Sequence, residues 1–139
     1  MKKTKIGLIG LGTVGSGVFK TLKNFPDVEV VKIAVKNISK PRNIEGLDNS
    51  ILTTNPEEVV NNPEIEIVAE LMGGVHPAYE LIKKAIENGK HVVTANKELL
   101  AKHGEELFHY AEKYNVVILY EAAIAGGIPL IMPIKTILA

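Results

Sequence analysis

A short apolar segment near the start of the chain runs directly into a glycine-rich turn. Residues 5–9 are Lys-Ile-Gly-Leu-Ile, and Gly10, Gly12 and Gly15 follow with the spacing G-x-G-x-x-G. In this pattern the first glycine allows a tight turn, the second lets the backbone approach a pyrophosphate, and the third lets the next helix pack closely on the sheet. The N–H groups and the positive dipole end of that helix would face the phosphates. The turn lies between a strand pattern and a helix pattern, so it predicts a dinucleotide-binding α/β fold.

The rest of the chain alternates strand and helix patterns, which is typical of an α/β fold. Strands are expected at 5–9, 28–35, 51–53, 65–70, 91–94 and 116–120. Helices are expected from the glycine turn to Asn24, from Pro56 after an Asn55 cap, from His76-Pro77 to Gly89 with His76 as the N-cap, and over 97–114. In the last helix the expected buried stripe is Leu99, Leu100, Leu107, Phe108 and Ala111, and Gly104 would weaken the helix by about 1 kcal/mol relative to Ala. Together these elements predict a Rossmann-type, doubly wound, mostly parallel sheet of order 3-2-1-4-5-6, with helices on both faces.

Two segments stand outside this alternation. Residues 36–50 are polar and contain Pro41 and Gly46, so we expect a loop there. Residues 129–139 carry apolar side chains at helical spacing but no capping signal. We therefore predict a dinucleotide-binding domain over 1–128, and over 129–139 the start of a helix that leads into a further domain.

The charge balance and the absence of cysteine narrow the classes of function. The chain has 16 Lys and Arg residues against 16 Asp and Glu residues, and it has no Cys. A nucleic-acid or anionic-membrane binder usually carries a basic excess, so we expect neither partner. Without cysteine there is no disulfide, no Cys nucleophile and no Cys-based metal site. No segment approaches the ~18 apolar residues of a membrane span, and the glycines of residues 6–18 argue against a secretory signal, so we expect a cytoplasmic protein with a small-molecule partner.

The residues after the second predicted strand bear on the choice of cofactor. An NAD site usually has an acidic residue about 20 positions after the glycine turn, where it binds the ribose 2′-hydroxyl. Here that position falls at Val35-Lys36, and the neighbouring charged residues are Lys36, Lys40 and Arg42. Cations suit a 2′-phosphate, so the sequence favours NADP while NAD stays possible. The alternative is an ordinary basic surface loop.

Other candidate residues also follow predicted strands and would share one edge of the sheet. Lys97 begins a predicted helix, where a positive charge is unfavourable next to the helix dipole. It could therefore have a function, either holding a carbonyl or carboxylate oxygen or taking part in proton transfer. The alternative is an ordinary lysine on the helix surface. Met72-Gly73-Gly74 follows the fourth strand. Glu121 opens a loop of small residues that could hold a hard cation or a substrate ammonium group; the alternative is that Glu121 caps a nearby helix. The four histidines show no i, i+4 pair on one face, which disfavours a His-based metal site.

Four segments, in order along nearly the whole chain, resemble homoserine dehydrogenase. They are Gly10-Leu-Gly-Thr-Val-Gly15, Glu70-Leu-Met-Gly-Gly74, Gly89-Lys-His-Val-Val-Thr-Ala-Asn-Lys-Glu-Leu-Leu-Ala101 and Tyr120-Glu-Ala-Ala-Ile-Ala-Gly-Gly-Ile-Pro129. The last two are far more specific than the glycine turn. The resemblance implies the NADPH- or NADH-dependent reduction of aspartate semialdehyde to homoserine, on the route to threonine, isoleucine and methionine.

The resemblance also assigns roles to residues of this chain. It places Leu11, Gly12, Thr13 and Val14 on the cofactor, Lys36 at the 2′-phosphate, and Lys97 beside cofactor and substrate with a part in catalysis. It implies a sodium ion held partly by main-chain carbonyls, at Glu121, Ile124, Gly126 and Ile128. The complete set of expected cofactor-binding residues is Gly10, Leu11, Gly12, Thr13, Val14, Gly15, Lys36, Lys40, Met72, Gly73 and Lys97.

In the family a catalytic domain follows the dinucleotide-binding domain and supplies much of a dimer interface. This domain is not in the 139 residues, so we expect the chain to bind cofactor without turnover and its parent protein to be a homodimer. Three alternatives stay open. One is another two-domain NAD(P) oxidoreductase, which typically has Glu-Lys-Pro where this chain has Asn96-Lys97-Glu98. The others are a nucleotide-sensing regulatory module, which usually has the missing ribose-binding acid, and a pseudoenzyme or structural interaction domain.

Overall fold

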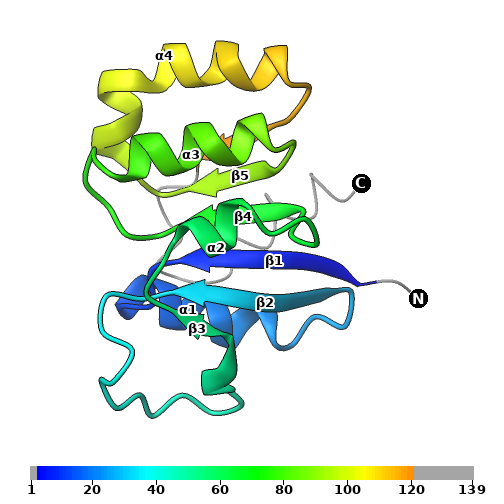
Figure 1. The fold of residues 1–139 in the computed structure, drawn as a ribbon, viewed down its shortest axis with the longest axis vertical. Coiled ribbons are helices and arrows are strands. Elements are labelled where there is room, and N and C mark those ends of the chain that lie inside the picture. Colours follow the sequence, from blue (N-terminus) through cyan, green and yellow to red (C-terminus); the bar gives the residue numbers. More distant parts are fainter. Residues whose placement is uncertain (1–2, 121–139) are drawn as a thin grey trace.

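The computed structural model describes residues 3–120, and these form one six-stranded sheet flanked by helices (Figure 1). The strands lie in the order β3-β2-β1-β4-β5-β6, and every neighbouring pair is parallel. The strands are β1 (Thr4–Ile9), β2 (Val28–Ala34), β3 (Leu52–Thr53), β4 (Ile67–Glu70), β5 (His91–Thr94) and β6 (Ile118–Tyr120). The predicted fold class and strand order are confirmed, with several strands shorter by one or two residues.

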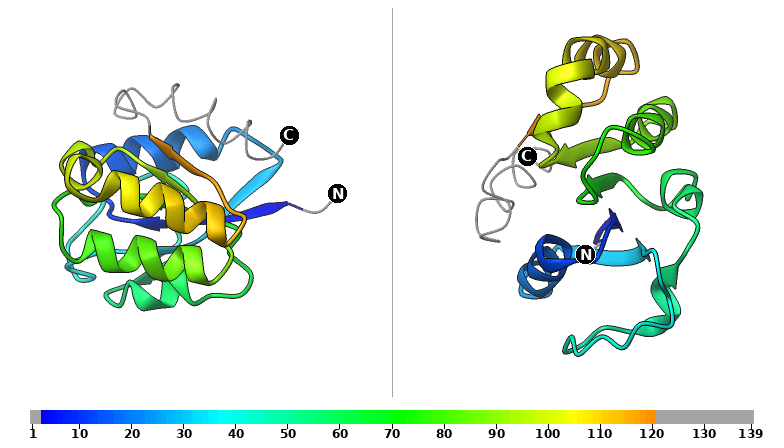
Figure 2. Two further views of the ribbon diagram at one scale, coloured as in Figure 1. Left: turned by 90° about the horizontal axis from the view of Figure 1, so that it is seen from above. Right: turned by 90° about the vertical axis from the view of Figure 1, so that its left-hand side faces the viewer.

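Helices cover both faces of the sheet, as Figure 2 shows in its right-hand view. They are α1 (Thr13–Leu22), α2 (Glu57–Val60), α3 (Ala78–Glu87) and α4 (Lys97–Lys113), with a short 3-10 helix over Asn49–Ile51. Helix α1 lies on one face, and α2, α3 and α4 lie on the other. The connection from β2 to β3 is the expected polar loop.

Two apolar layers, one on each face of the sheet, form the core. On the α1 face, Val18, Phe19 and Leu22 pack with strand residues such as Leu8 and Ile33. The opposite layer joins α2, α3 and α4 to the sheet through residues such as Val59, Ile82, Leu107, Val68 and Val92. Because both faces are covered, β4 and β5 are buried along almost their whole length.

Two sequence expectations about helices were wrong. His76 does not cap α3: the helix begins at Ala78 after Pro77, and the His76 ring instead contacts the Glu80 carboxylate, with Nδ1 2.7 Å from Oε2. Phe108, expected in the buried stripe of α4 beside Leu107, is 45% exposed. Successive helical residues are about 100° apart, so Leu107 takes the core-facing position and turns Phe108 toward solvent.

The sequence suggests an interruption of the last helix at Gly104, and it predicts Asn55 as the cap of the short helix after Pro56. Gly104 does not break α4, which is continuous and capped at its start by Asn96, whose Oδ1 accepts the Leu99 N–H at 3.0 Å. Asn55 Oδ1 accepts the Glu57 N–H at 3.0 Å, which stabilises the start of α2. Within residues 3–120, no helix is long and apolar enough to cross a membrane.

Candidate functional site

The glycine turn joins β1 to α1 at the carboxyl edge of the sheet. Gly10 has φ +108°, a backbone conformation that side chains disfavour, and its N–H donates to the Ala34 carbonyl of β2 at 2.9 Å. A Cβ on Gly15 would lie 2.4 Å from the Gly10 carbonyl oxygen. Gly15 therefore lets α1 start directly against the turn, as the glycine spacing predicts.

Gly12 lies at the N-cap of α1 and faces open space. A Cβ placed there would meet no atom within 4 Å, so the room beside this residue is not filled by the protein. Gly12 also lacks a side chain with which to cap the first N–H groups of α1, and these can therefore bind an anion. The geometry fits the pyrophosphate of a dinucleotide.

A cleft of about 440 Å³ opens beside this turn. It collects residues from the ends of four strands: the turn after β1, the loop after β2, the segment after β3 and the loop after β4. Its lining comprises Ile9, Gly10, Leu11, Gly12, Ala34, Val35, Lys36, Asn37, Lys40, Arg42, Thr54, Pro56, Leu71 and Met72. A crevice at the carboxyl ends of the strands, where the strand order reverses beside β1, is the usual ligand position in this class of fold.

Six of the predicted cofactor residues line this cleft, and five do not. Those that line it are Gly10, Leu11, Gly12, Lys36, Lys40 and Met72. Three of the others, Thr13, Val14 and Gly15, belong to the first turn of α1. Gly73 comes directly after Met72 in the loop that follows β4. Lys97 is the first residue of α4 and is exposed. Lys97 therefore shares the carboxyl edge with the cleft without forming its wall.

Arg42 differs from the two lysines of the same loop. Its guanidinium donates to the carbonyls of Asn37 at 2.7 Å and Lys40 at 3.0 Å. The Asn37 side chain in turn accepts the Ser39 N–H at 3.0 Å. Arg42 therefore folds the loop onto itself, whereas the side chains of Lys36 and Lys40 are exposed at the cleft.

Sequence reasoning missed the part played by Glu70 at the end of β4. The residue is fully buried, and three donors converge on its carboxylate. Oε1 accepts the Thr94 hydroxyl at 2.6 Å, while Oε2 accepts the N–H groups of Met72 at 3.1 Å and Gly73 at 3.0 Å. An acidic residue that ends an otherwise apolar strand was the available signal.

The hydrogen bonds continue from Thr94 to the start of α4. The Thr94 hydroxyl oxygen accepts the Asn96 N–H at 3.0 Å. The Asn96 amide donates from Nδ2 to the Gly74 carbonyl at 2.5 Å, and its Oδ1 caps α4. The loop after β4 and the loop after β5 are thus joined at the residue that precedes Lys97.

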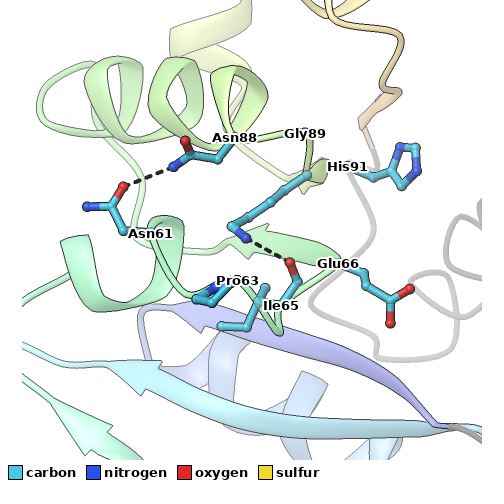
Figure 3. A pocket seen from close by; sticks show the side chains of 8 residues that line it. Asn61, Pro63, Ile65, Glu66, Asn88, Gly89 and His91 are labelled. Carbon is cyan, nitrogen blue, oxygen red and sulfur yellow. Dashed lines mark hydrogen bonds between the residues drawn. The ribbon is translucent and has the colours of Figure 1, made fainter.

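A second hollow, of about 480 Å³, lies at the opposite end of the sheet (Figure 3). It is lined by Asn61, Pro63, Ile65, Glu66, Asn88, Gly89, Lys90 and His91. The Lys90 side chain is buried there, and its Nζ donates to the carbonyls of Asn62 at 2.5 Å and Ile65 at 2.8 Å. Burial lowers the pKa of Lys90 below 10.5. This hollow holds none of the predicted site residues, so the cleft at the carboxyl edge is the candidate site.

Several sequence predictions fall on parts of the chain that the structure does not describe. The expected sodium ligands Glu121, Ile124, Gly126 and Ile128 lie outside residues 3–120, as does the helix expected over 129–139. These stay predictions.

Comparison with known proteins gives one consistent family. The sequence profile described as "Homoserine dehydrogenase, NAD binding domain" matches residues 10–121. The homoserine dehydrogenase of Synechocystis sp. is 46% identical over 94% of this chain, and that of Pseudomonas aeruginosa is 45% identical over 97%. The chain spans about a third, 32%, of the length of each of these relatives.

Solved structures agree in both fold and sequence. A crystal structure of a homoserine dehydrogenase from Thiobacillus denitrificans superposes with a TM-score of 0.79 at 47% identity, covering 88% of this chain and 30% of that one. The homoserine dehydrogenase of S. aureus at pH 6.0 superposes with a TM-score of 0.80 at 39% identity, covering 88% of this chain and 33% of that one.

Proposed function

The chain belongs to the homoserine dehydrogenase family, in which it corresponds to the NAD-binding domain, and from this premise we propose that it binds NADP(H) in the cleft at the carboxyl edge. In the whole protein the cofactor would serve the interconversion of L-homoserine and L-aspartate 4-semialdehyde, in the biosynthesis of threonine, methionine and isoleucine. Its relatives' names and their 40–46% identity support this reaction.

The observation that carries the choice of cofactor is the charge of the cleft. Lys36 and Lys40 line it, and its lining contains no Asp or Glu within the described part of the chain. A ribose 2′-hydroxyl is usually bound by a carboxylate, which would repel a 2′-phosphate, whereas ammonium groups attract one. We therefore place the 2′-phosphate near Lys36 and Lys40 and the pyrophosphate at Gly12. NAD remains a second, weaker ligand of the same cleft.

Lys97 is the residue of this chain to which we assign a chemical role. Bound NADPH supplies the hydride that converts the aldehyde carbon to an alcohol. The Lys97 ammonium, at the start of α4 on the same edge, would hold the substrate oxygen or carboxylate and assist proton transfer to that oxygen.

The remaining assignments rest on the family alone. We propose that residues 1–128 form the dinucleotide-binding domain and that 129–139 lead toward the catalytic and dimerisation domain of a cytoplasmic homodimer. A sodium ion would be held at Glu121, Ile124, Gly126 and Ile128. Because the chain spans 32% of the length of its Synechocystis relative, we expect the 139 residues to bind cofactor without turning over substrate.

The double variant Lys36→Ala/Lys40→Ala tests the choice of cofactor. We expect its NADPH dissociation constant to rise at least about tenfold while that for NADH changes little, because only NADPH carries the 2′-phosphate. Fluorescence titration of the 139-residue chain measures both. Lys102→Ala, an exposed lysine on α4, is the control for loss of a positive charge.

An unchanged ratio of NADPH to NADH affinity in the double variant would contradict the assignment to NADP. The reaction itself is tested with the full-length protein, to which aspartate semialdehyde and NADPH are offered. If NADPH binds there and is not oxidised, the proposed reaction is wrong.

A further inference from the structure

We propose that Glu70 is a positioning residue that couples the cofactor-binding loop after β4 to the start of α4, where Lys97 lies. The inference rests on the proposed function of the cleft and adds a residue to which no role has been assigned. It follows from one continuous set of hydrogen bonds through Glu70, Thr94 and Asn96.

The first half of this set holds the loop after β4. Glu70 accepts the N–H groups of both Met72 and Gly73, and Met72 forms part of the cleft wall. Gly73 and Gly74 each have φ +77°, so the loop adopts a backbone path that needs glycine. Hydrogen bonds from N–H groups to a buried carboxylate are charge-assisted, and they hold this path more firmly than neutral partners would.

The second half reaches α4. The other oxygen of Glu70 accepts the Thr94 hydroxyl, and the Thr94 oxygen accepts the Asn96 N–H. The Asn96 side chain then bridges the Gly74 carbonyl and the Leu99 N–H. A shift of the loop would therefore move the cap of α4 and the adjacent Lys97.

The cost of this arrangement indicates a role beyond packing. Glu70 is the one buried carboxylate among residues 3–120. Burying a charge is unfavourable, and an apolar residue would complete the end of a buried parallel strand more cheaply. The buried carboxylate of Glu70 instead fixes the loop after β4 and the loop after β5, at the edge where cofactor and substrate would meet. Residues that support a functional site commonly hold its loops in the productive geometry in this way.

Three variants test the inference in the 139-residue chain. Glu70→Gln keeps the shape but replaces one carboxylate oxygen with an NH2 group. It therefore removes the charge-assisted hydrogen bonds, and the Thr94 hydroxyl can no longer donate to that position, where it can only accept from the NH2 group. Thr94→Val removes the linking hydroxyl at nearly constant volume, and Thr94→Ser restores it. The control is Lys90→Met, which removes a buried charge at the opposite end of the sheet.

NADPH affinity and backbone amide NMR supply two independent readouts. We expect the dissociation constant for NADPH to rise about tenfold in Glu70→Gln and Thr94→Val, and to stay within about twofold of wild type in Thr94→Ser and Lys90→Met. In wild type and Thr94→Ser, NADPH should shift the amide resonances of Lys97 and Leu99. Those shifts should be lost in Glu70→Gln and Thr94→Val.

The outcomes separate this inference from the proposed function. If wild type binds NADPH and the Glu70→Gln and Thr94→Val variants bind it equally well, Glu70 does not position the loop. If Thr94→Ser binds NADPH as weakly as Thr94→Val does, the hydroxyl of Thr94 does not link the two loops. This comparison does not depend on Glu70→Gln, so it can be made even if that variant does not fold. If wild type itself binds no nicotinamide cofactor, the proposed function fails and this inference fails with it.

Discussion

Gly10, Gly12 and Gly15 meet three different physical requirements within one turn. Gly10 has a positive φ, Gly15 has the Gly10 carbonyl where a Cβ would lie, and Gly12 has empty space there. Two of these glycines are therefore needed by the fold itself. The third is needed only if something else occupies the space beside it.

This difference predicts opposite behaviour for two alanine variants. Gly15→Ala should lower the free energy of unfolding by about 1–3 kcal/mol, because the new methyl overlaps the Gly10 carbonyl. Gly12→Ala should leave the melting temperature within about 2 °C of wild type, yet weaken NADPH binding at least about tenfold by obstructing the pyrophosphate. Thermal unfolding and fluorescence titration measure the two effects. Tight NADPH binding by Gly12→Ala would place the pyrophosphate elsewhere.

At the scale of the elements, the helices start in different ways. Helix α4 is capped by the Asn96 side chain, as a local sequence pattern can predict. Helix α3 has no side-chain cap, and its first turn is stabilised by the contact between His76 and Glu80 four residues apart. Both helices start at the carboxyl edge of the sheet. The contacts that stabilise their first turns therefore also fix the backbone near the candidate site.

The contact at α3 gives a prediction for acid stability. The hydrogen bond from His76 is the main cause that lowers the pKa of Glu80 below its ordinary 4.5. The folded state therefore gains stability from Glu80 at pH values above about 4.5, and loses it as the pH falls through the lowered pKa. Glu80→Gln should thus unfold more easily than wild type near neutral pH, with the difference disappearing in acid.

Urea unfolding at a series of pH values from about 6 to 3 measures this difference. Glu98→Gln is the matched control, because Glu98 is an exposed acidic residue in the first turn of α4. Parallel pH profiles for wild type and Glu80→Gln would show that the His76 contact does not form in solution.

At the scale of the whole molecule, one end of the sheet carries the candidate site, and the other end contributes to stability. The carboxyl edge carries the cleft and the Glu70 hydrogen bonds. At the opposite end, Lys90 holds the segment between α2 and β4 through two hydrogen bonds to its carbonyls. A change at the Lys90 end should therefore alter stability without altering cofactor binding.

Lys90→Met should lower the free energy of unfolding at neutral pH by about 1–3 kcal/mol, because the carbonyls of Asn62 and Ile65 lose their donor. Since burial lowers the pKa of Lys90 in the folded state, the unfolded chain binds more protons between that lowered pKa and 10.5. The stability of wild type relative to Lys90→Met should therefore rise as the pH increases through this range. Urea unfolding from about pH 7 to 10 tests the sign, and a falling difference would contradict it.

The strand order and the layers of this fold follow from patterns that are local in the sequence. The glycine spacing, the apolar strand runs and the helical stripes predicted a parallel sheet of order 3-2-1-4-5-6, which the structure confirms. These signals are readable because each lies within a few consecutive residues. The same local signals predicted Gly10, Gly12, Lys36 and Lys40 as cofactor residues, and all four line one cleft.

The partners of the polar side chains depend instead on contacts between segments that are far apart in the sequence. Glu70 lies 24 residues from Thr94, and Asn96 lies 22 residues from Gly74, so no local pattern joins them. The structure also showed that Arg42 binds its own loop and that Phe108 faces solvent. In each case the partner of a side chain depends on how distant segments pack, because a hydrogen bond or a buried contact forms only where folding brings both groups within about 3–4 Å.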